Sequence, residues 1–314
     1  MENLIFSLNA TMPVFLMMIL GYALNRIGVF DEQFADKMNK FVFNAALPVL
    51  LFKDLSKADF YSIWDTRFVL FCFLATLICI IVMVGLSGFV HDKSIQGEFI
   101  QAAFRSSPAL LGVAFVQNIY GEAGAASLMI IGAVPLYNIA AVVILTLMKP
   151  ERGKIDKRLI LKTLKGVITN PLIIGVVLGI GWSVLRIPQP VIMQKTVSDF
   201  AAVATPLGLM ALGACFDMKK AFARLKPALV CTIFKLLIFV AAFLPAAVWM
   251  GFRRDKLVSI LVMLGAASTV SCFTMARSMG HEGTLSSSTV MLTTLFSAFT
   301  LTFWLYLVKS VGMI

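Results

Sequence analysis

The sequence predicts an all-α integral membrane protein with ten transmembrane helices. Of its 314 residues, 60% are apolar and only 14% are charged, and the mean hydropathy is +0.92. Soluble chains are typically about 25% charged, so this chain has too little charge to cover a water-facing surface. A spanning helix needs about 20 apolar residues, and apolar runs of that size fill most of the length. The lipid bilayer is therefore the first predicted partner.

The apolar runs follow one another with short polar segments between them. The first run lacks the basic flank and small-residue cleavage site of a signal peptide, so we predict a permanent span there. The ten spans are expected near residues 4–24, 38–55, 67–90, 97–119, 123–148, 160–184, 197–216, 228–250, 256–277 and 285–308.

The basic residues predict the orientation in the membrane. The net charge is +11, and a dense group of Lys and Arg between residues 149 and 165 marks the loop after the fifth span as cytoplasmic. Both termini are then on the non-cytoplasmic side of the cell inner membrane. No nucleic-acid partner is predicted, because this charge lies in loops between spans, where it sets orientation.

The two halves of the chain match each other at a nearly constant offset. Five spans per half is an odd number, so the second half must enter the membrane from the opposite side. We predict a first five-helix repeat over 1–150, a basic cytoplasmic linker over 151–160 and an inverted second repeat over 161–314. Such folds place the substrate where interrupted helices of the two halves meet. At an offset of 158 residues, Pro13, Gly21 and Pro48 match Pro171, Gly179 and Pro206.

Spans four and nine are predicted to be interrupted near their middles. Span four contains Pro108 and Gly112, and proline removes a backbone hydrogen bond and clashes with the preceding turn. The matching segment 265–274 of span nine has small hydroxylated residues, which can satisfy freed backbone groups. Close helix packing is the alternative role for such residues. Pro48 and Pro206 are predicted to break spans two and seven, with a plain kink as the alternative.

Charged and polar residues within the spans are the candidates for substrate contact, because they are costly in a bilayer. Arg105 is the foremost of them, with pairing to Glu98 or snorkelling to the interface as alternatives. Lys235 is expected to snorkel, and His281 is expected to be solvated in a loop. The predicted substrate-binding residues are Asn44, Arg105, Ser106, Ser107, Pro108, Gly112, Tyr137, Asn138, Thr205, Ser268, Thr269 and Ser271.

The sequence offers little support for an enzyme. It contains no phosphate loop, nucleophile elbow or zinc motif, so neither a catalytic residue nor a bound metal or cofactor is predicted. The five cysteines lie inside apolar runs and are expected to be small buried hydrophobic residues. The spans also lack a clear buried acidic pair of the kind that proton antiporters use.

Several short motifs resemble the auxin efflux carrier family, which includes plant PIN-type exporters and bacterial permeases proposed for malate and malonate. These are the segment Pro13–Gly21 with Tyr22, Gly28-Val-Phe, and Asn44-Ala-Ala-Leu-Pro48, in that order. The resemblance implies a bile-acid symporter/sodium–proton antiporter-like architecture, in which unwound spans four and nine cross between a scaffold and a transport domain.

The chain departs from the usual span-four pattern of that family, Asn, four residues, Gly, one residue, Pro. Ser107 stands in place of the Asn and Ala114 in place of the Pro, while Gly112 matches. Span nine also lacks the proline that the family usually has near Ser268.

The sequence thus predicts a secondary active or facilitative carrier of a small organic anion, a mono- or dicarboxylate or auxin-like acid. Alternating access at the helix four/nine crossing would move the anion, by an elevator-like or rocking motion, and helix N-termini would favour its charge. One alternative is a sodium-coupled symporter of the bile-acid type, with hydroxyl and amide ligands from Asn44, Ser268, Thr269 and Ser271. Another is a ligand sensor that does not transport. Small residues along three spans permit a homodimer.

Overall fold

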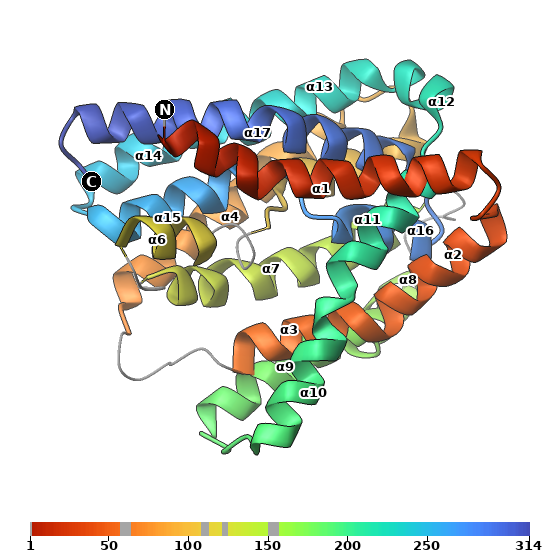
Figure 1. The fold of residues 1–314 in the computed structure, drawn as a ribbon, viewed down its shortest axis with the longest axis horizontal. Coiled ribbons are helices and arrows are strands. Elements are labelled where there is room, and N and C mark those ends of the chain that lie inside the picture. Colours follow the sequence, from red (N-terminus) through yellow and green to blue (C-terminus); the bar gives the residue numbers. More distant parts are fainter. Residues whose placement is uncertain (1, 57–63, 108–112, 121–124, 150–156) are drawn as a thin grey trace.

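The computed structural model describes residues 2–56, 64–107, 113–120, 125–149 and 157–314, and the described chain is a bundle of helices (Figure 1). No β-strand occurs in these ranges. The first part comprises α1 (Glu2–Arg26), α2 (Glu32–Phe41), the π turn η1 (Val42–Ala46), α3 (Leu47–Ser56), α4 (Thr66–Ser87), the 3₁₀ turn η2 (Lys93–Ile95), α5 (Gln96–Phe104), α6 (Val113–Tyr120) and α7 (Ala126–Leu147).

The second part is also helical throughout its elements. It comprises α8 (Lys157–Ile168), α9 (Pro171–Val184), α10 (Val191–Ala202), α11 (Ala204–Ala214), α12 (Met218–Ala223), α13 (Leu225–Ile233), the π turn η4 (Phe234–Ile238), α14 (Phe239–Trp249), α15 (Arg254–Gly265), α16 (Ser271–Ser278) and α17 (Thr284–Ser310).

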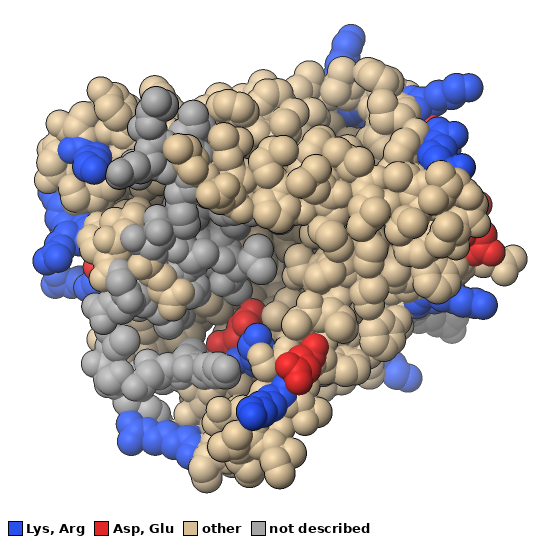
Figure 2. Space-filling model, in the orientation of Figure 1, with Lys and Arg blue, Asp and Glu red and all other residues tan. Residues whose placement is uncertain are grey.

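Several helices are long and apolar enough to cross a membrane. Among the described residues, five helical stretches satisfy both conditions: Thr66–Ser87, Leu128–Leu147, Val191–Ala214, Leu225–Trp249 and Thr284–Ser310. Figure 2 shows Lys and Arg at the left and right edges of this face and, together with acidic side chains, in its lower middle, whereas the upper middle is mostly uncharged. The all-helical, multi-pass class predicted from composition is thereby confirmed, whereas the count of ten spans and the repeat boundaries stay predictions.

Short polar caps fix where several helices begin. The side chain of Asp65 accepts a hydrogen bond from the Phe68 amide at the start of α4, at 3.1 Å. Asn170 accepts one from Leu172 at the start of α9, at 2.9 Å, with Pro171 as the first helical residue. These caps satisfy amides that have no partner within the helix.

Two pairs of helices pack closely, α1 with α11 and α3 with α9. In Figure 1, α1 runs across the upper half of the molecule and α3 and α9 lie in the lower half. Glycines make this approach possible. A Cβ atom on Gly21 would collide with the Met210 backbone, and one on Gly213 would collide with the Met18 backbone. Gly175 faces the Pro48 backbone of α3 in the same way. Backbone contact through glycine is a common way of associating helices within a bilayer.

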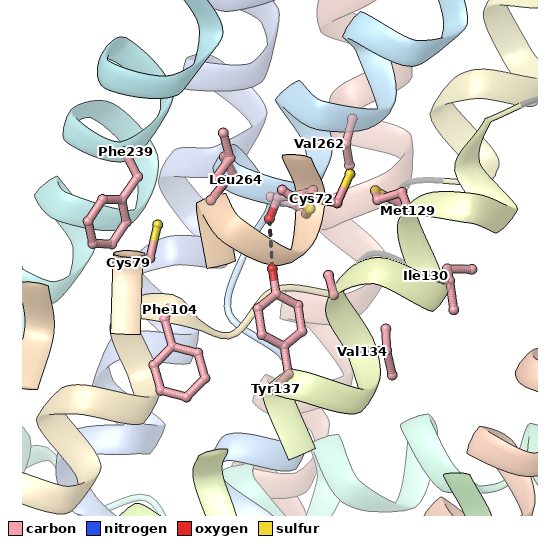
Figure 3. Packing of buried hydrophobic residues seen from close by; sticks show 14 of the residues in the cluster. Cys72, Cys79, Phe104, Met129, Ile130, Val134, Tyr137, Phe239, Val262 and Leu264 are labelled. Carbon is pink, nitrogen blue, oxygen red and sulfur yellow. Dashed lines mark hydrogen bonds between the residues drawn. The ribbon is translucent and has the colours of Figure 1, made fainter. Parts of the chain in front are cut away.

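The remaining long helices pack around a large hydrophobic core. Helix α7 packs on α4, α13 packs on α17, and α14 packs on α15. Figure 3 shows part of this core, where Cys72 and Cys79 of α4 lie among Phe104, Tyr137 and Phe239. These two cysteines are buried and unbonded, as the sequence predicted for small hydrophobic residues.

Two helices that pack in this core, α5 and α15, end inside the protein, and the chain becomes helical again a few residues later. Helix α5 ends at Phe104, and Arg105 is already extended, with φ −73° and ψ 133°. Helix α15 ends at Gly265, Ala266 is extended with φ −72° and ψ 159°, and α16 begins at Ser271. We call residues 105–107 the first break and residues 266–270 the second break. Pro108 and Gly112, predicted to cause the first interruption, lie outside the described residues.

The segments around Pro48 and Pro206 are altered in different ways. The chain stays helical through Pro48, because the π turn η1 widens the helix just before it and the Leu47 amide bonds to the Val42 carbonyl. The predicted break at Pro48 is thus a widened turn. Near Pro206 the helix changes at Val203, between α10 and α11, three residues before the proline.

Candidate functional site

A cavity of about 370 Å³ lies where the two breaks face the π turn η1, α3 and the first residues of α9 and α11. Both breaks, the π turn η1 with α3, the middle of α7 and the start of α11 contribute to its wall. It is lined by Val42, Leu47, Leu50, Leu51, Lys53, Asp54, Arg105, Ser106, Ser107, Gln117, Val134, Tyr137, Asn138, Leu172, Ala204, Thr205, Thr269, Val270, Ser271 and Thr274.

Arg105 is the most unusual group in this wall. Its side chain is buried, and one terminal nitrogen donates to Asn138 Oδ1 at 3.0 Å and to Ser271 Oγ at 2.7 Å. The other terminal nitrogen contacts the Met275 sulfur, and Nε has no hydrogen-bond partner. None of the ion pairs among the described residues involves Arg105. Arg105 is thus a buried cation whose described partners are all neutral groups, an arrangement that costs free energy unless hydrogen bonds compensate for the lost water.

The two alternatives for Arg105 are wrong in this structure. Glu98 does not pair with it: the two carboxylate oxygens accept hydrogen bonds from the amides of Gly283 and Ser286, at 2.8 and 2.9 Å. Nor does Arg105 snorkel to an interface, since only 3% of the residue is exposed. The break turns the side chain back across the protein interior, toward α7 and α16.

The second break contributes hydroxyl groups. Thr269 and Ser271 line the cavity, and their hydroxyls lie 3.2 Å apart. Ser268 is turned away from it: its hydroxyl donates to the Ala102 carbonyl of α5 at 2.5 Å, and its amide donates to Thr293 Oγ1 at 3.0 Å. Ser268 instead lines a separate cavity of about 30 Å³, together with Thr11, Ser107, Thr205, Thr269 and Thr294 among others.

Helix α7 supplies the adjacent pair Tyr137 and Asn138. Tyr137 reaches across the core in Figure 3, where its hydroxyl donates to the Met263 carbonyl at 3.4 Å and its ring stacks on Phe104. Asn138 donates to the Val134 carbonyl at 2.9 Å and accepts from Arg105. Both residues border the cavity while also fixing the first break in place.

The other predicted residues divide between wall and surface. Ser106, Ser107 and Thr205 line the cavity. Asn44 does not: it is exposed, and its amide donates to the Lys40 carbonyl at 2.9 Å. The π turn rotates this part of the helix, so that Val42 and Leu47 face the cavity instead.

Sequence reasoning missed several polar groups of the site. Lys53, Asp54, Gln117 and Thr274 line the cavity, and the Thr274 hydroxyl has no hydrogen-bond partner. Asp54 stands at the end of an apolar run, where a charged residue alone does not indicate a site. Only the position of α3 against the breaks brings it into the wall.

Lys235 is a further correction. It was expected to snorkel, yet only 1% of it is exposed, and its ammonium donates to Ser106 Oγ at 2.6 Å within the first break. Its position inside an apolar run, near one end of the predicted eighth span, was the available signal, since a charge within a span marks a functional site by default. The π turn η4, which directs the side chain inward, cannot be read from the sequence.

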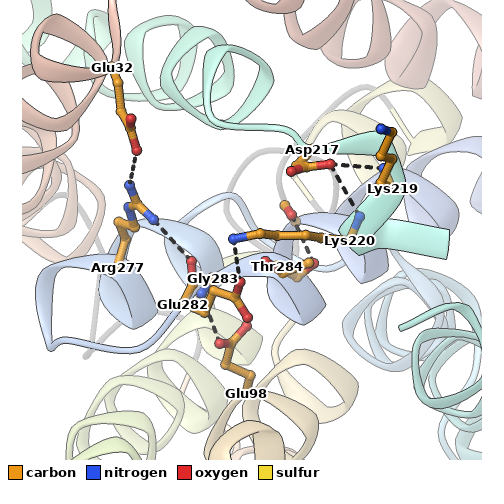
Figure 4. A network of polar contacts seen from close by, with 10 residues as sticks. Glu32, Glu98, Asp217, Lys219, Lys220, Arg277, Glu282, Gly283 and Thr284 are labelled. Carbon is orange, nitrogen blue, oxygen red and sulfur yellow. Dashed lines mark hydrogen bonds and ion pairs between the residues drawn. The ribbon is translucent and has the colours of Figure 1, made fainter. Parts of the chain in front are cut away.

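A second polar group lies at the end of the molecule where α2, α12 and α16 meet (Figures 1 and 4). Arg277 pairs with Asp36 at 3.1 Å and Glu32 at 3.7 Å, and Lys220 pairs with Glu282 at 2.8 Å. His281, expected in a solvated loop, is buried, with Nε2 2.8 Å from the Leu145 carbonyl. The ion pairs join α2 to α16, and α12 to the segment that precedes α17.

A cavity between interrupted helices of a multi-pass bundle, lined by both apolar and polar side chains, is typical of membrane carriers. A family model described as membrane transport protein matches residues 6–305. The chain therefore belongs to this family, the auxin efflux carrier family, and the resemblance seen in the motifs is confirmed.

Individual relatives agree with this assignment. A protein of Rhizobium meliloti named Putative malonate transporter is 22% identical over 306 residues, which cover 95% of each chain. Uncharacterized transporter YfdV of Escherichia coli K12 is 31% identical over 166 residues, 49% of this chain and 51% of the relative. The chain thus matches about half the length of the latter protein.

Proposed function

We propose that this protein carries a small organic anion across the membrane, with a dicarboxylate such as malonate as the first substrate to test. The anion would bind at Arg105 in the 370 Å³ cavity and be released by alternating access around the two breaks. Because the family is one of membrane transport proteins, we infer no enzymatic activity. A cavity of this size is suited to a molecule of a few heavy atoms.

One observation carries the proposal: Arg105 lines the cavity, is buried and has no acidic partner among the described residues. Taking an ionised group out of water is costly unless an opposite charge or good hydrogen bonds compensate. A bound carboxylate would supply that charge and accept from the unpartnered Nε. The nearby hydroxyls of Ser271 and Thr274 would add further hydrogen bonds.

The arrangement of the helices supports the inverted repeat that this mechanism needs. In the predicted alignment, the first span corresponds to the sixth and the second to the seventh. The pair α1–α11 then corresponds to α9–α3, and both pairs are in contact. Gly21 and Gly179, which match at the repeat offset, each face the backbone of the opposing helix. We propose that both termini lie outside the cytoplasm, as the basic loop predicts.

A sodium-coupled symporter is a second candidate, favoured by the 30 Å³ cavity beside the main one. Hydroxyl groups of Thr11, Ser107, Thr205, Ser268 and Thr294 are available in its wall. Sodium sites need several oxygen ligands where a helix is interrupted. No carboxylate is among the residues that line this cavity, so a bound sodium ion would depend on neutral oxygens alone.

Transport into liposomes tests the leading proposal. Purified protein should take up labelled malonate, and Arg105→Gln should reduce the apparent affinity by about 10- to 100-fold, because hydrogen bonds to charged groups contribute about 1.5–3 kcal/mol each. Arg67→Gln is the matched control, since Arg67 is exposed at the start of α4 and outside the cavity. Absence of uptake of every mono- and dicarboxylate, with Arg105→Gln indistinguishable from the unaltered protein, would refute the proposal.

A further inference from the structure

Lys235 is a second buried cation close to the site, and the transport proposal does not use it. It lies in the π turn η4 and only 1% of it is exposed. None of the ion pairs among the described residues involves it. It is absent from the wall of the main cavity, so its ammonium is behind the first break rather than in direct reach of a bound anion.

The partners of Lys235 are a side-chain hydroxyl within the first break and a backbone carbonyl at the end of α5. Its ammonium is 2.6 Å from Ser106 Oγ and 3.5 Å from the carbonyl of Phe104, the last residue of α5. Carbonyls at a helix C-terminus have no partner within the helix and attract positive charge.

The second break also forms a hydrogen bond with Ser106, the residue that accepts from Lys235. The Ser106 hydroxyl, which accepts from Lys235, donates to the carbonyl of Ala266 at 3.4 Å. Ala266 is the extended residue that directly follows the end of α15. Oxygens from both breaks therefore converge around one ammonium group and its hydroxyl partner. Oxygens freed by interrupted helices are the ligands with which carriers bind alkali cations.

We propose that Lys235 is a tethered cation that occupies the place of a coupling metal ion, so that the breaks are held together and anions are bound without sodium. The inference rests on the proposed function for its anion site. In this role Lys235 is a positioning residue: its charge holds Ser106 and the end of α5, and thereby the backbone that carries Arg105. The chain supplies by covalent attachment what a sodium-coupled carrier must take from solution.

The unaltered protein provides the first test. Malonate binding, measured by calorimetry on purified protein, should have the same dissociation constant within about twofold in choline, potassium and sodium chloride at equal ionic strength. The equal ionic strength excludes general screening of the cavity charge. A dissociation constant that falls about tenfold or more on adding sodium overturns the proposal and supports the symporter.

Variants at position 235 provide the second test. Lys235→Ala should weaken malonate binding by about tenfold or more in choline, because the hydrogen bonds of a charged group are lost. Ethylammonium, or sodium, should restore at least part of that affinity by entering the vacated space. Lys235→Arg, which keeps the charge, should stay within about threefold of the unaltered protein. Lys256→Ala is the control for the amine, since Lys256 pairs with Asp65 at a partly exposed position.

The outcomes separate this inference from the transport proposal. Unchanged malonate affinity in Lys235→Ala overturns the inference but leaves the transport proposal intact. The same conclusion follows if the affinity lost in Lys235→Ala is restored by neither ethylammonium nor sodium and Lys235→Arg also loses affinity. If the unaltered protein binds no malonate, the melting temperature of ligand-free Lys235→Ala is the readout. It should rise with ethylammonium, by mass action on the folded state, while Lys256→Ala should not respond. Equal responses of the two variants overturn the inference.

Discussion

The two breaks face the same cavity, but they are built from different chemistry. The first break, residues 105–107, presents Arg105 to the cavity and is held from behind by Lys235. The second break, residues 266–270, presents hydroxyls and is held by bonds between Ser268 and neighbouring groups of α5 and α17. Positive charge is thus concentrated at one break.

This difference indicates that the two breaks have different roles, one in anion affinity and the other in the shape and stability of the site. An anion would owe its binding energy to the first break, whereas the second break would chiefly set the shape of the site and the packing of α5. A buried, uncompensated charge costs free energy until a ligand arrives, while satisfied hydroxyl bonds stabilise the protein with or without a ligand. Variants of the two breaks should therefore separate affinity from stability.

The largest expected effect is at Arg105. Arg105→Met should abolish stabilisation by malonate while changing the melting temperature of the ligand-free protein little, because the cost of burying the charge is removed together with its hydrogen bonds to Asn138 and Ser271. Differential scanning fluorimetry with and without malonate measures both quantities. Retained malonate stabilisation would contradict the assignment of affinity to the first break.

A smaller effect on stability is expected at Glu98, which holds α5 ahead of the first break. Its carboxylate accepts from the Gly283 and Ser286 amides at the start of α17. Glu98→Gln places an amide donor against one of these donors, so the free energy of unfolding should fall by about 1–3 kcal/mol. The exposed Glu32→Gln is the control, and chemical denaturation measures both variants. An equal change in the control would rule out a specific anchor.

Variants at Ser268 and Thr269 test whether the second break contributes mainly to stability. Ser268→Ala removes the hydrogen bond to the Ala102 carbonyl and should lower the free energy of unfolding by about 1 kcal/mol. Thr269→Ala, whose hydroxyl faces the cavity, should change stability less. Thermal unfolding of the two variants side by side decides this, and a larger loss in Thr269→Ala would show that the second break is held differently.

The smallest expected effect is a pH dependence outside the membrane, at the joint of α4 and α15. A hydrogen bond from Lys256, at 2.6 Å, lowers the pKa of Asp65, and the Phe68 amide adds to this while partial burial opposes it. A lowered pKa in the folded state stabilises the protein above the unfolded pKa of about 3.9, and this stability is lost as the pH falls toward the folded value.

The corresponding experiment compares unfolding near neutral pH and below pH about 4. Asp65→Asn should be destabilised by no more than about 1 kcal/mol near neutral pH, and the difference from the unaltered protein should shrink as the pH falls. Asp199→Asn, at an exposed position, should show no such convergence. A constant difference across the pH range would mean that the charge of Asp65 is not involved.

The sequence predicted the first elements of the site because they depend on local chemistry. Arg105, Ser107, Thr205, Thr269 and Ser271 all line the cavity, and each was chosen as a polar group beside a predicted interruption. Such a group is costly in a bilayer wherever the helix goes, so its presence alone marks a candidate.

Two of the corrections, those of Asn44 and Lys235, have a common cause, which is the direction of a side chain. Asn44 and Lys235 both lie in π turns. A π turn inserts an extra residue and rotates everything after it relative to an α-helix, so periodicity predicts the wrong face. Asn44 consequently points outward and Lys235 inward, the reverse of the expectation for each.

The sequence by itself determined that the chain is an all-helical membrane protein of this transporter family, because composition and short motifs set which segments can lie in lipid. Only the tertiary structure decided that Arg105 has no acidic partner within the described part of the chain, while Glu98 caps α17 and Lys235 holds the first break. Glu98 and Lys235 each bond to residues more than a hundred positions away in the sequence, and only the packing of the helices brings these partners together. That packing depends on backbone contacts at glycines such as Gly21 and Gly213, and no local pattern specifies it.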